Sequence, residues 1–513
     1  MARQTTLHDV GTLRFDARAQ VDPAEVRSVR EAVRDSGIEH LYVVVHGAHN
    51  DESVTRDADS AFHGMLADAW ADAAGGAGCL TVQWPSLCFR DEGVWGIAQQ
   101  VTEQERAGRP GISKTLYEDL LRHLPDGSAP LAEIAELLRE QPPHDRAFDD
   151  LGSALRRLAE IPLQDPLAEY AADTEGEILP QSDPLMLFED TKTVCGEFAG
   201  ALSDLMSAAE DQEPGESGRQ EDGAGASGAE ASDGETPDAE VSEEGTLPEI
   251  RVAGHRPTAP RSDRVNRVGT VATGGPVGLD RHRQGPAEVW RGAHELFRQV
   301  VRHVLRRRAG AVGQAGLGPC LSALVESSET RIHLVGHGLG GRLAGFALRG
   351  LEARHSESVT LASLTLLQAE MSHFVFADSL PQQVSGHGAL WNQRRLVQGP
   401  LICTFSHLDT HLGVLYPLSA QMIGDSAEMA TTARKWGALG FDGIQGVDGP
   451  PDITLDALNE MSARDLSKMP YTNVDASSLF RSADVPMGGH HHVIRPEVGR
   501  LLRKVAESPA ALP

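Results

Sequence analysis

The stretch RIHLVGHGLGGRLAGFAL, residues 331–348, is the part of the sequence that decides the fold. Ile332, Leu334 and Val335 form a short apolar run that is typical of a buried strand. Residues 336–341, rich in glycine, are the expected turn, and helix-forming residues resume at Arg342. A strand, a tight turn and a helix in this order indicate an α/β protein.

Two motifs fit this turn, and they imply different chemistry. Gly336, Gly338 and Gly341 match G-x-G-x-x-G, the dinucleotide-binding loop, and Glu370 follows the next expected strand, where a ribose-binding carboxylate belongs. The same residues also match G-x-S-x-G, the nucleophile elbow of hydrolases, with Gly338 in place of the serine. Because the glycine turn belongs to a mid-chain strand, we favour the elbow and keep the dinucleotide loop as an alternative.

Other segments supply the remaining layers of an α/β sheet. The run LYVVV at residues 41–45 has the continuous apolar pattern of a strand buried on both faces. Strands alternating with helices predict a mostly parallel sheet flanked by helices. Further strands are expected at 80–84, 361–367, 401–405 and 471–479, and helices at 60–74, at 289–305 and from Pro496 onward.

The chain divides into four expected parts. Residues 1–112 and 286–513 form the two parts of the sheet core. Leucines at helical spacing predict a helical insertion over 113–206, which is either a cap over a site or plain structural elaboration. Residues 207–249 hold 14 acidic residues and one basic residue, and 251–285 are rich in proline, glycine and arginine. We therefore expect 207–285 to be a disordered linker.

Charge and composition exclude several classes of function. A formal net charge of −28 argues against nucleic acid as a partner, because phosphate binding needs a basic surface. The five cysteines show no C-x-x-C spacing, so neither a disulfide framework nor a zinc knuckle is indicated. The N-terminus has no apolar signal segment, and no apolar run is long enough to span a bilayer. The expected setting is the cytoplasm.

Residues in the order of a hydrolase site support the elbow interpretation. Asp409 follows the strand expected at 401–405, and His490 lies just before the last helix. The order of Gly338, Asp409 and His490 is the chain order of nucleophile, acid and base in α/β-hydrolases. His46-Gly47, after the strand at 41–45, is where a second oxyanion donor would come from.

The sequence resembles the α/β-hydrolase fold family, and within it a group of uncharacterised actinobacterial hydrolase-like proteins. In such relatives the elbow reads G-H-S-x-G, so the resemblance implies ester or amide hydrolysis, whereas Gly338 here lacks the nucleophile. The resemblance covers the first strands and nearly everything after residue 286. It rests on VVVHGAHND (43–51), RAGAVGQAGLGP (308–319), IHLVGHGLGG (332–341), SLTLLQAEMSHFVFAD (363–378), GPLICTFSHLDTHLGVLYPLSA (399–420) and HHHVIRPEV (490–498).

Roles follow from the resemblance residue by residue. Gly338 occupies the nucleophile's position, Asp409 matches the orienting acid, and His490 matches the base. The adjacent His491 and His492 leave the choice of base open. The backbone N–H groups of Leu339 and Ala48 are expected to form the oxyanion hole. Asp409 has a second interpretation, as a residue that caps a turn.

Two substitutes for the missing serine remain open. A metal-bound water is one, because His407, Asp409 and His411 alternate along the chain and would share one face if extended. Ser372 and Ser406 are candidate nucleophiles, although neither lies on an elbow. Gly338 is either a natural loss or an engineered one.

The expected function is therefore that of a pseudohydrolase with a binding or regulatory role. Its expected partners are a small-molecule or acyl ligand in the elbow pocket, or a protein; we expect no cofactor and no bound metal. An active hydrolase using a metal-bound water or another nucleophile is the first alternative. A dinucleotide-binding protein is the second.

Overall fold

The computed structural model describes most of the two core parts of the chain and the helices between them. The described residues are 7–47, 52–73, 76–87, 89, 111–159, 172–175, 187, 189–210, 285–327, 329–354, 359–381, 386–409, 411–417, 437–448, 451–480 and 493–509. Ala48, His490 and most of the expected linker lie outside them. Those expectations stay predictions.

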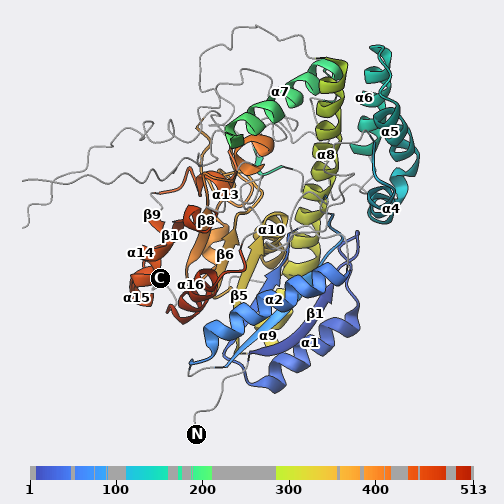
Figure 1. The fold of residues 1–513 in the computed structure, drawn as a ribbon. Helices are drawn as coiled ribbons and strands as arrows, with labels where there is room; N and C mark the ends of the chain where they lie inside the picture. Colours follow the sequence, from blue (N-terminus) through green and yellow to red (C-terminus); the bar gives the residue numbers. More distant parts are fainter. Residues whose placement is uncertain are drawn as a thin grey trace, which may run out of the picture.

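An eight-stranded sheet forms the centre of the molecule (Figure 1). Its order is β1-β3-β2-β5-β6-β8-β10-β9, and neighbouring strands are parallel throughout. The strands are β1 (His8–Arg14), β2 (His40–Val45), β3 (Ala77–Gln83), β5 (Arg331–His337), β6 (Ser363–Leu367), β8 (Leu401–Phe405), β9 (Asp452–Thr454) and β10 (Tyr471–Asp475). The expected α/β class, with a parallel sheet, is confirmed.

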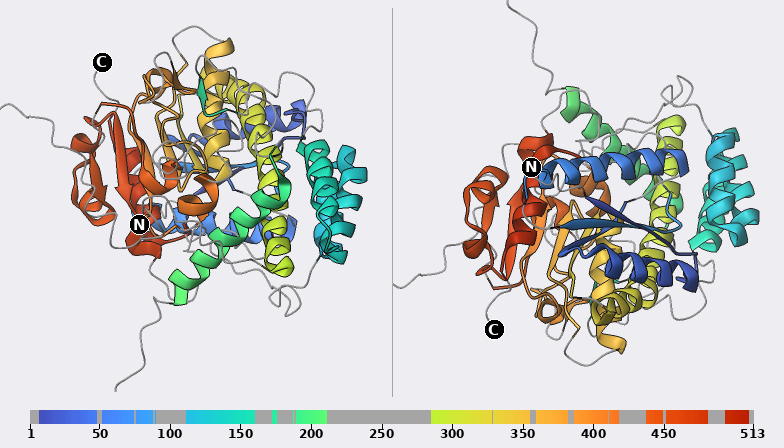
Figure 2. Two further views of the ribbon diagram at one scale, coloured as in Figure 1. Left: turned by 90° about the horizontal axis from the view of Figure 1, so that it is seen from above. Right: turned by 90° about the horizontal axis from the view of Figure 1, so that it is seen from below.

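Helices cover both faces of this sheet, as Figure 2 shows from above and below. One face packs on α1 (Pro23–Ser36), α8 (Pro286–Ala311), α9 (Gly318–Ser327) and α10 (Leu339–Arg354). The other packs on α2 (Glu52–Trp70), α14 (Leu455–Glu460), α15 (Ala463–Leu466) and α16 (Pro496–Glu507). Burial of both faces explains the apolar run LYVVV in β2 and the largely apolar sequences of the other central strands.

The described residues of the segment expected to be a helical insertion are mostly helical, and their helices pack on α8 from two sides (Figure 1). Its helices are α4 (Lys114–His123), α5 (Ser128–Glu140), α6 (Arg146–Ala159) and α7 (Thr191–Glu210). Helix α7 continues past residue 206, so the first four residues of the expected linker are helical. A short antiparallel pair, β4 (Thr174–Glu175) with β7 (His387–Gly388), joins the insertion to the core.

Several elements differ from the sequence-based expectation. Strand β1 and helix α1 were not predicted. Strand β1 has only two buried apolar residues, Val10 and Leu13, and its register with β3 shifts between Asp9 and Gly11. The helix predicted at 289–305 runs to Ala311 and continues through a π-helical segment, Val312–Leu317, into α9. A Cβ on Gly313 would collide with the carbonyl oxygen of Leu343, so small residues let this segment touch the backbone of α10. Such contacts leave no apolar periodicity in the sequence.

The last strand is also shorter than expected. The predicted strand at 471–479 ends at Asp475 and is followed by a 3-10 helix, Ser477–Phe480.

A short helix, α13 (Leu439–Asp442), packs beside β8. In the described part of the chain, no helix is long and apolar enough to cross a membrane.

Candidate functional site

The turn between β5 and α10 is a single residue. The strand continues through His337 and the helix begins at Leu339, so Gly338 alone reverses the chain. The expected six-residue turn at 336–341 was therefore too long. Gly338 has φ of +54°, a left-handed conformation that residues other than glycine adopt at a cost. A sharp strand-to-helix turn with a strained central residue is the geometry that a nucleophile elbow requires.

Glycines beside the turn let the helix press against the sheet. A Cβ on Gly340 would collide with the carbonyl oxygens of Val45 and His46, at the end of β2. A Cβ on Gly336 would lie 2.7 Å from the Cα of Gly341. The N-terminus of α10 therefore lies directly on the carboxyl end of β2, and side chains at these positions would force the two apart.

Backbone hydrogen bonds fix the turn against the neighbouring strand β6. The amide of Gly338 donates to the carbonyl oxygen of Leu367 over 3.1 Å, and the amide of Glu370 donates to the carbonyl oxygen of Gly338 over 2.9 Å. Both bonds use backbone groups, so they do not depend on the side chain at position 338.

Asp409 lies at the same edge of the sheet, after β8, which is separated from β5 by β6 alone. It is fully buried. Its carboxylate accepts a hydrogen bond from the amide of Leu412 over 3.0 Å, and its carbonyl accepts one from Gly413 over 2.9 Å. Asp409 therefore caps the π-helical turn His411–Leu415, which is the second interpretation of this residue. Its pairing with a histidine stays a prediction, because His490 lies outside the described residues.

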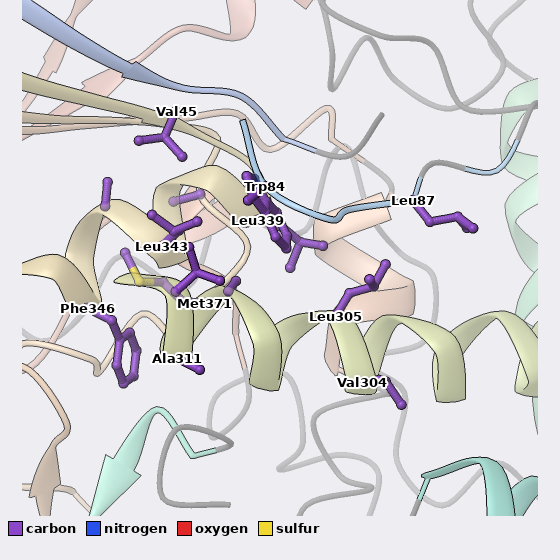
Figure 3. Close-up of a cluster of buried hydrophobic side chains, with 14 of the residues drawn as sticks. Val45, Trp84, Leu87, Val304, Leu305, Ala311, Leu339, Leu343, Phe346 and Met371 are labelled. Atoms are coloured by element: carbon purple, nitrogen blue, oxygen red, sulfur yellow. The ribbon is translucent and has the colours of Figure 1, made fainter. Parts of the chain in front are cut away.

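Of the two expected oxyanion donors, the structure describes only Leu339. Leu339 is the first residue of α10, and its side chain is buried beside Trp84 in a cluster that includes Leu343 (Figure 3). Its amide thus lies at the N-terminus of a helix, where N–H groups are not used within the helix. Ala48 lies outside the described residues.

The side chains of two residues next to the turn, His46 and Trp84, were not assigned roles from the sequence. The ring of His46 is buried, and its Nδ1 lies 2.9 Å from the carbonyl oxygen of Gly47, to which it donates. Burial lowers the pKa of His46 to about 4, although the bond to Gly47 raises it, so the ring is neutral at neutral pH. The indole of Trp84 donates to the carbonyl oxygen of His46 over 3.2 Å.

A buried ion cluster lies behind the turn, centred on Glu370. Arg302 donates to its carboxylate over 2.8 Å and Arg306 over 3.0 Å, and His411 lies 3.8 Å away. Burial by itself would raise the pKa of Glu370, but Arg302, Arg306 and His411 hold it well below its usual range. The only signal in the sequence is the spacing of Arg302 and Arg306, which places them on one face of a helix.

A second acid, the half-buried Asp173, connects the insertion to this cluster. It forms an ion pair with Arg342 of α10, and its carboxylate accepts hydrogen bonds from the amide of Ser372 and the hydroxyl of Tyr416, over 2.8 and 3.0 Å. Arg342 in turn donates to the carbonyl oxygen of Arg306 over 3.0 Å. Asp173 thus anchors the segment 172–175 to the helix that begins at the turn.

The geometry argues against the dinucleotide interpretation. Glu370 is buried and its carboxylate is bound by two arginines, so it is not available to a ribose hydroxyl. The space in front of Gly340 is filled by the carbonyl end of β2 rather than open to a pyrophosphate. Gly336 and Gly341 serve close packing of helix on sheet, and Gly338 forms the turn.

The structure also does not assemble the two expected substitutes for the serine, a metal site or another nucleophile, among the described residues. His407 packs against Phe405 and Phe441, whereas His411 points to Glu370. Among the described residues, no group of three metal-ligating side chains converges. The hydroxyls of Ser372 and Ser406 accept hydrogen bonds from the amides of Phe374 and Leu408, and no described hydrogen bond joins either of them to a histidine.

The fold and this edge define the class: an α/β protein with a one-residue strand-to-helix turn at the carboxyl end of a parallel sheet. In open α/β sheets, ligands bind at this edge. No family model, curated protein or solved structure matches the chain.

Proposed function

We propose that this chain is an α/β-hydrolase-fold protein that has lost its nucleophile and acts by binding a ligand rather than by hydrolysing it. The observation that carries the proposal is Gly338 alone between β5 and α10 at φ +54°, the place and conformation of a nucleophilic serine. Asp409, buried two strands along the sheet, supports it.

Loss of the serine removes the covalent chemistry and leaves the binding groups. Removing the nucleophile from a serine triad lowers the rate by about 10⁶-fold, or about 8 kcal/mol of transition-state stabilisation. The oxyanion donors are backbone amides, which remain when the side chain changes. Position 338 tolerates glycine without strain, so the fold keeps its turn while catalysis is lost.

The substitution Gly338→Ser tests this proposal, with Gly338→Ala as the matched control. Both variants add a Cβ in the left-handed conformation, at about 1–3 kcal/mol of strain, and only serine adds a hydroxyl. We expect Gly338→Ser to gain hydrolysis of p-nitrophenyl acetate and labelling by a fluorophosphonate. The natural chain and Gly338→Ala should show neither.

Two further substitutions assign the partners of the new hydroxyl. Adding His490→Ala to Gly338→Ser should abolish the gained activity, and adding Asp409→Asn should lower it by about 10⁴-fold, the effect of that change in a serine protease triad. A natural chain that already reacts with the fluorophosphonate would contradict the proposal, because it would reveal another nucleophile. A folded but unreactive Gly338→Ser protein would equally contradict it.

A further inference from the structure

Arg308 of α8 is a buried arginine held by backbone carbonyl groups. Its Nη1 donates to the carbonyl oxygen of Pro85 and its Nη2 to that of His123, both over 2.9 Å. The side chain is 2% exposed. Pro85 follows β3 at the carboxyl edge of the sheet, and His123 is the last residue of α4, so Arg308 lies where the insertion meets that edge.

The charge of Arg308 has no acid to balance it among the described residues. Burial lowers the pKa of Arg308 to about 10, so the guanidinium is still protonated at neutral pH. Its neighbours on the same helix, Arg302 and Arg306, share the carboxylate of Glu370, whereas the ion pairs of the described residues include none for Arg308. The carboxyl end of α4 offers only the partial negative charge of a helix terminus. Buried charges in proteins are normally paired.

Arg308 also has hydrogen-bond donors left over. A guanidinium carries five N–H groups, and the two described bonds use two of them. Its Nε is buried without an acceptor. Arg394 is a useful contrast, because its three nitrogens donate to the carbonyl oxygens of Pro470, Val397 and Gly399. A role as a clamp on backbone carbonyls engages all three nitrogens of Arg394, whereas it leaves the Nε of Arg308 unused.

Buried leucines flank the two groups that Arg308 binds. Leu87 and Leu124, close in sequence to the two bound carbonyls, are buried. Leu305 lies one turn away from Arg308 on the same helix and is buried. Figure 3 shows Leu305 below Trp84, and Leu87 to the right of Trp84. Burial, and then the nearby charges of Arg308 and Arg122, lower the pKa of His123 to about 4, so this ring adds no charge of its own.

We propose that Arg308 binds the carboxylate of a ligand whose apolar tail packs on the neighbouring side chains. A carboxylate accepts two parallel N–H bonds from one guanidinium, which fits the unused Nε donor beside a terminal nitrogen. The buried leucines Leu87 and Leu305 are the side chains that the proposal places against the tail. This inference rests on the proposed binding function and names its ligand class.

Titration calorimetry of the full chain with sodium octanoate tests the inference. We expect one saturable site, and an affinity for octan-1-ol or inorganic phosphate that is about 10- to 100-fold lower, because the alcohol lacks the charge and phosphate lacks the tail. Arg308→Met should weaken octanoate binding by a similar factor. Arg394→Met, which removes an arginine whose nitrogens are all bonded, should leave it unchanged.

Several results would overturn the assignment. They are absence of octanoate binding to the natural chain, equal affinity for octanoate and octan-1-ol, and unchanged binding in Arg308→Met. If Arg308→Met does not fold, the comparison of octanoate with octan-1-ol on the natural chain still decides. None of these measurements depends on the Gly338→Ser assays, so failure of the carboxylate site and failure of the elbow proposal are distinguishable.

Discussion

The amide of Glu370 donates a hydrogen bond to the carbonyl oxygen of Gly338 over 2.9 Å, while the carboxylate of the same residue binds two arginines of α8. One residue therefore couples the strand-to-helix turn to the buried ion cluster behind it. The position of the turn depends on a charge balance as well as on apolar packing.

The substitution Glu370→Gln should destabilise the fold strongly. It removes the negative charge that Arg302 and Arg306 share in the interior, and removing one partner of a buried ion pair typically lowers the free energy of unfolding by about 3–5 kcal/mol. Urea denaturation measures the loss. Glu118→Gln is the control, because its pair with Lys114 is exposed and should contribute less than about 0.5 kcal/mol. Equal stability of the two variants would mean that the cluster is not coupled to folding.

Asp173→Asn should loosen the attachment of segment 172–175. The change leaves an oxygen for Ser372 and Tyr416 but removes the charge opposite Arg342, which is fully buried. We expect faster hydrogen exchange at the amide of Ser372 and a loss of about 3 kcal/mol in unfolding free energy. Glu175→Gln, in a partly exposed pair with Arg349, should change neither. Unchanged exchange at Ser372 in Asp173→Asn would argue against the anchor.

Two glycines in helices should respond to alanine in opposite directions. In Gly340→Ala the new methyl group would overlap the backbone carbonyl oxygens of Val45 and His46, which cannot move away, so we expect a loss of about 3 kcal/mol or more. Gly64 of α2 has nothing within 4 Å of its Cβ position. Gly64→Ala should therefore stabilise the protein by about 0.5–1 kcal/mol, the difference in helix propensity. Thermal unfolding of the two variants compares them directly. Tolerance of Gly340→Ala would show that α10 does not press on β2.

Acid should destabilise the protein through its buried histidines. Burial lowers the pKa of His46, His123 and His294 to about 4, whereas histidine in an unfolded chain has a pKa of about 6.5. Between these values the unfolded chain binds protons that the folded chain does not, so stability is full above about pH 6.5 and is lost as the pH falls toward 4. Asp59 acts in the opposite direction, because burial raises its pKa to about 6.

Urea denaturation at several pH values between 7.5 and 4.5 measures this dependence. His46→Asn keeps a donor for Gly47 but cannot titrate. Its free energy of unfolding should therefore fall less steeply with decreasing pH than that of the natural chain, and the two slopes should differ by about 1.4 kcal/mol per pH unit. His8→Asn, at an exposed position of β1, is the control. A slope in His46→Asn equal to that of the natural chain would mean that His46 does not remain neutral in the fold.

The sequence by itself determined the α/β class, the central strands and the position of the turn at Gly338. Strands β2, β5 and β8 are buried on both faces, and a strand in that environment is largely apolar, so the pattern is local. The turn was locatable because glycine is the residue that a left-handed conformation favours. The edge strand β1, with its bulge, carried no such pattern.

Only the tertiary structure decided which charges meet. Glu370 and Arg302 are 68 residues apart, and Asp173 reaches Ser372 across 199 residues. Glu370 has the position of a ribose-binding carboxylate because it follows a strand, but its partners come from a helix whose arginines carry no mark of burial in the sequence. Arg308 would likewise be expected at the surface, as most arginines are. Long-range charge pairing has no periodicity along the chain, and so it emerges only when the helices pack on the sheet.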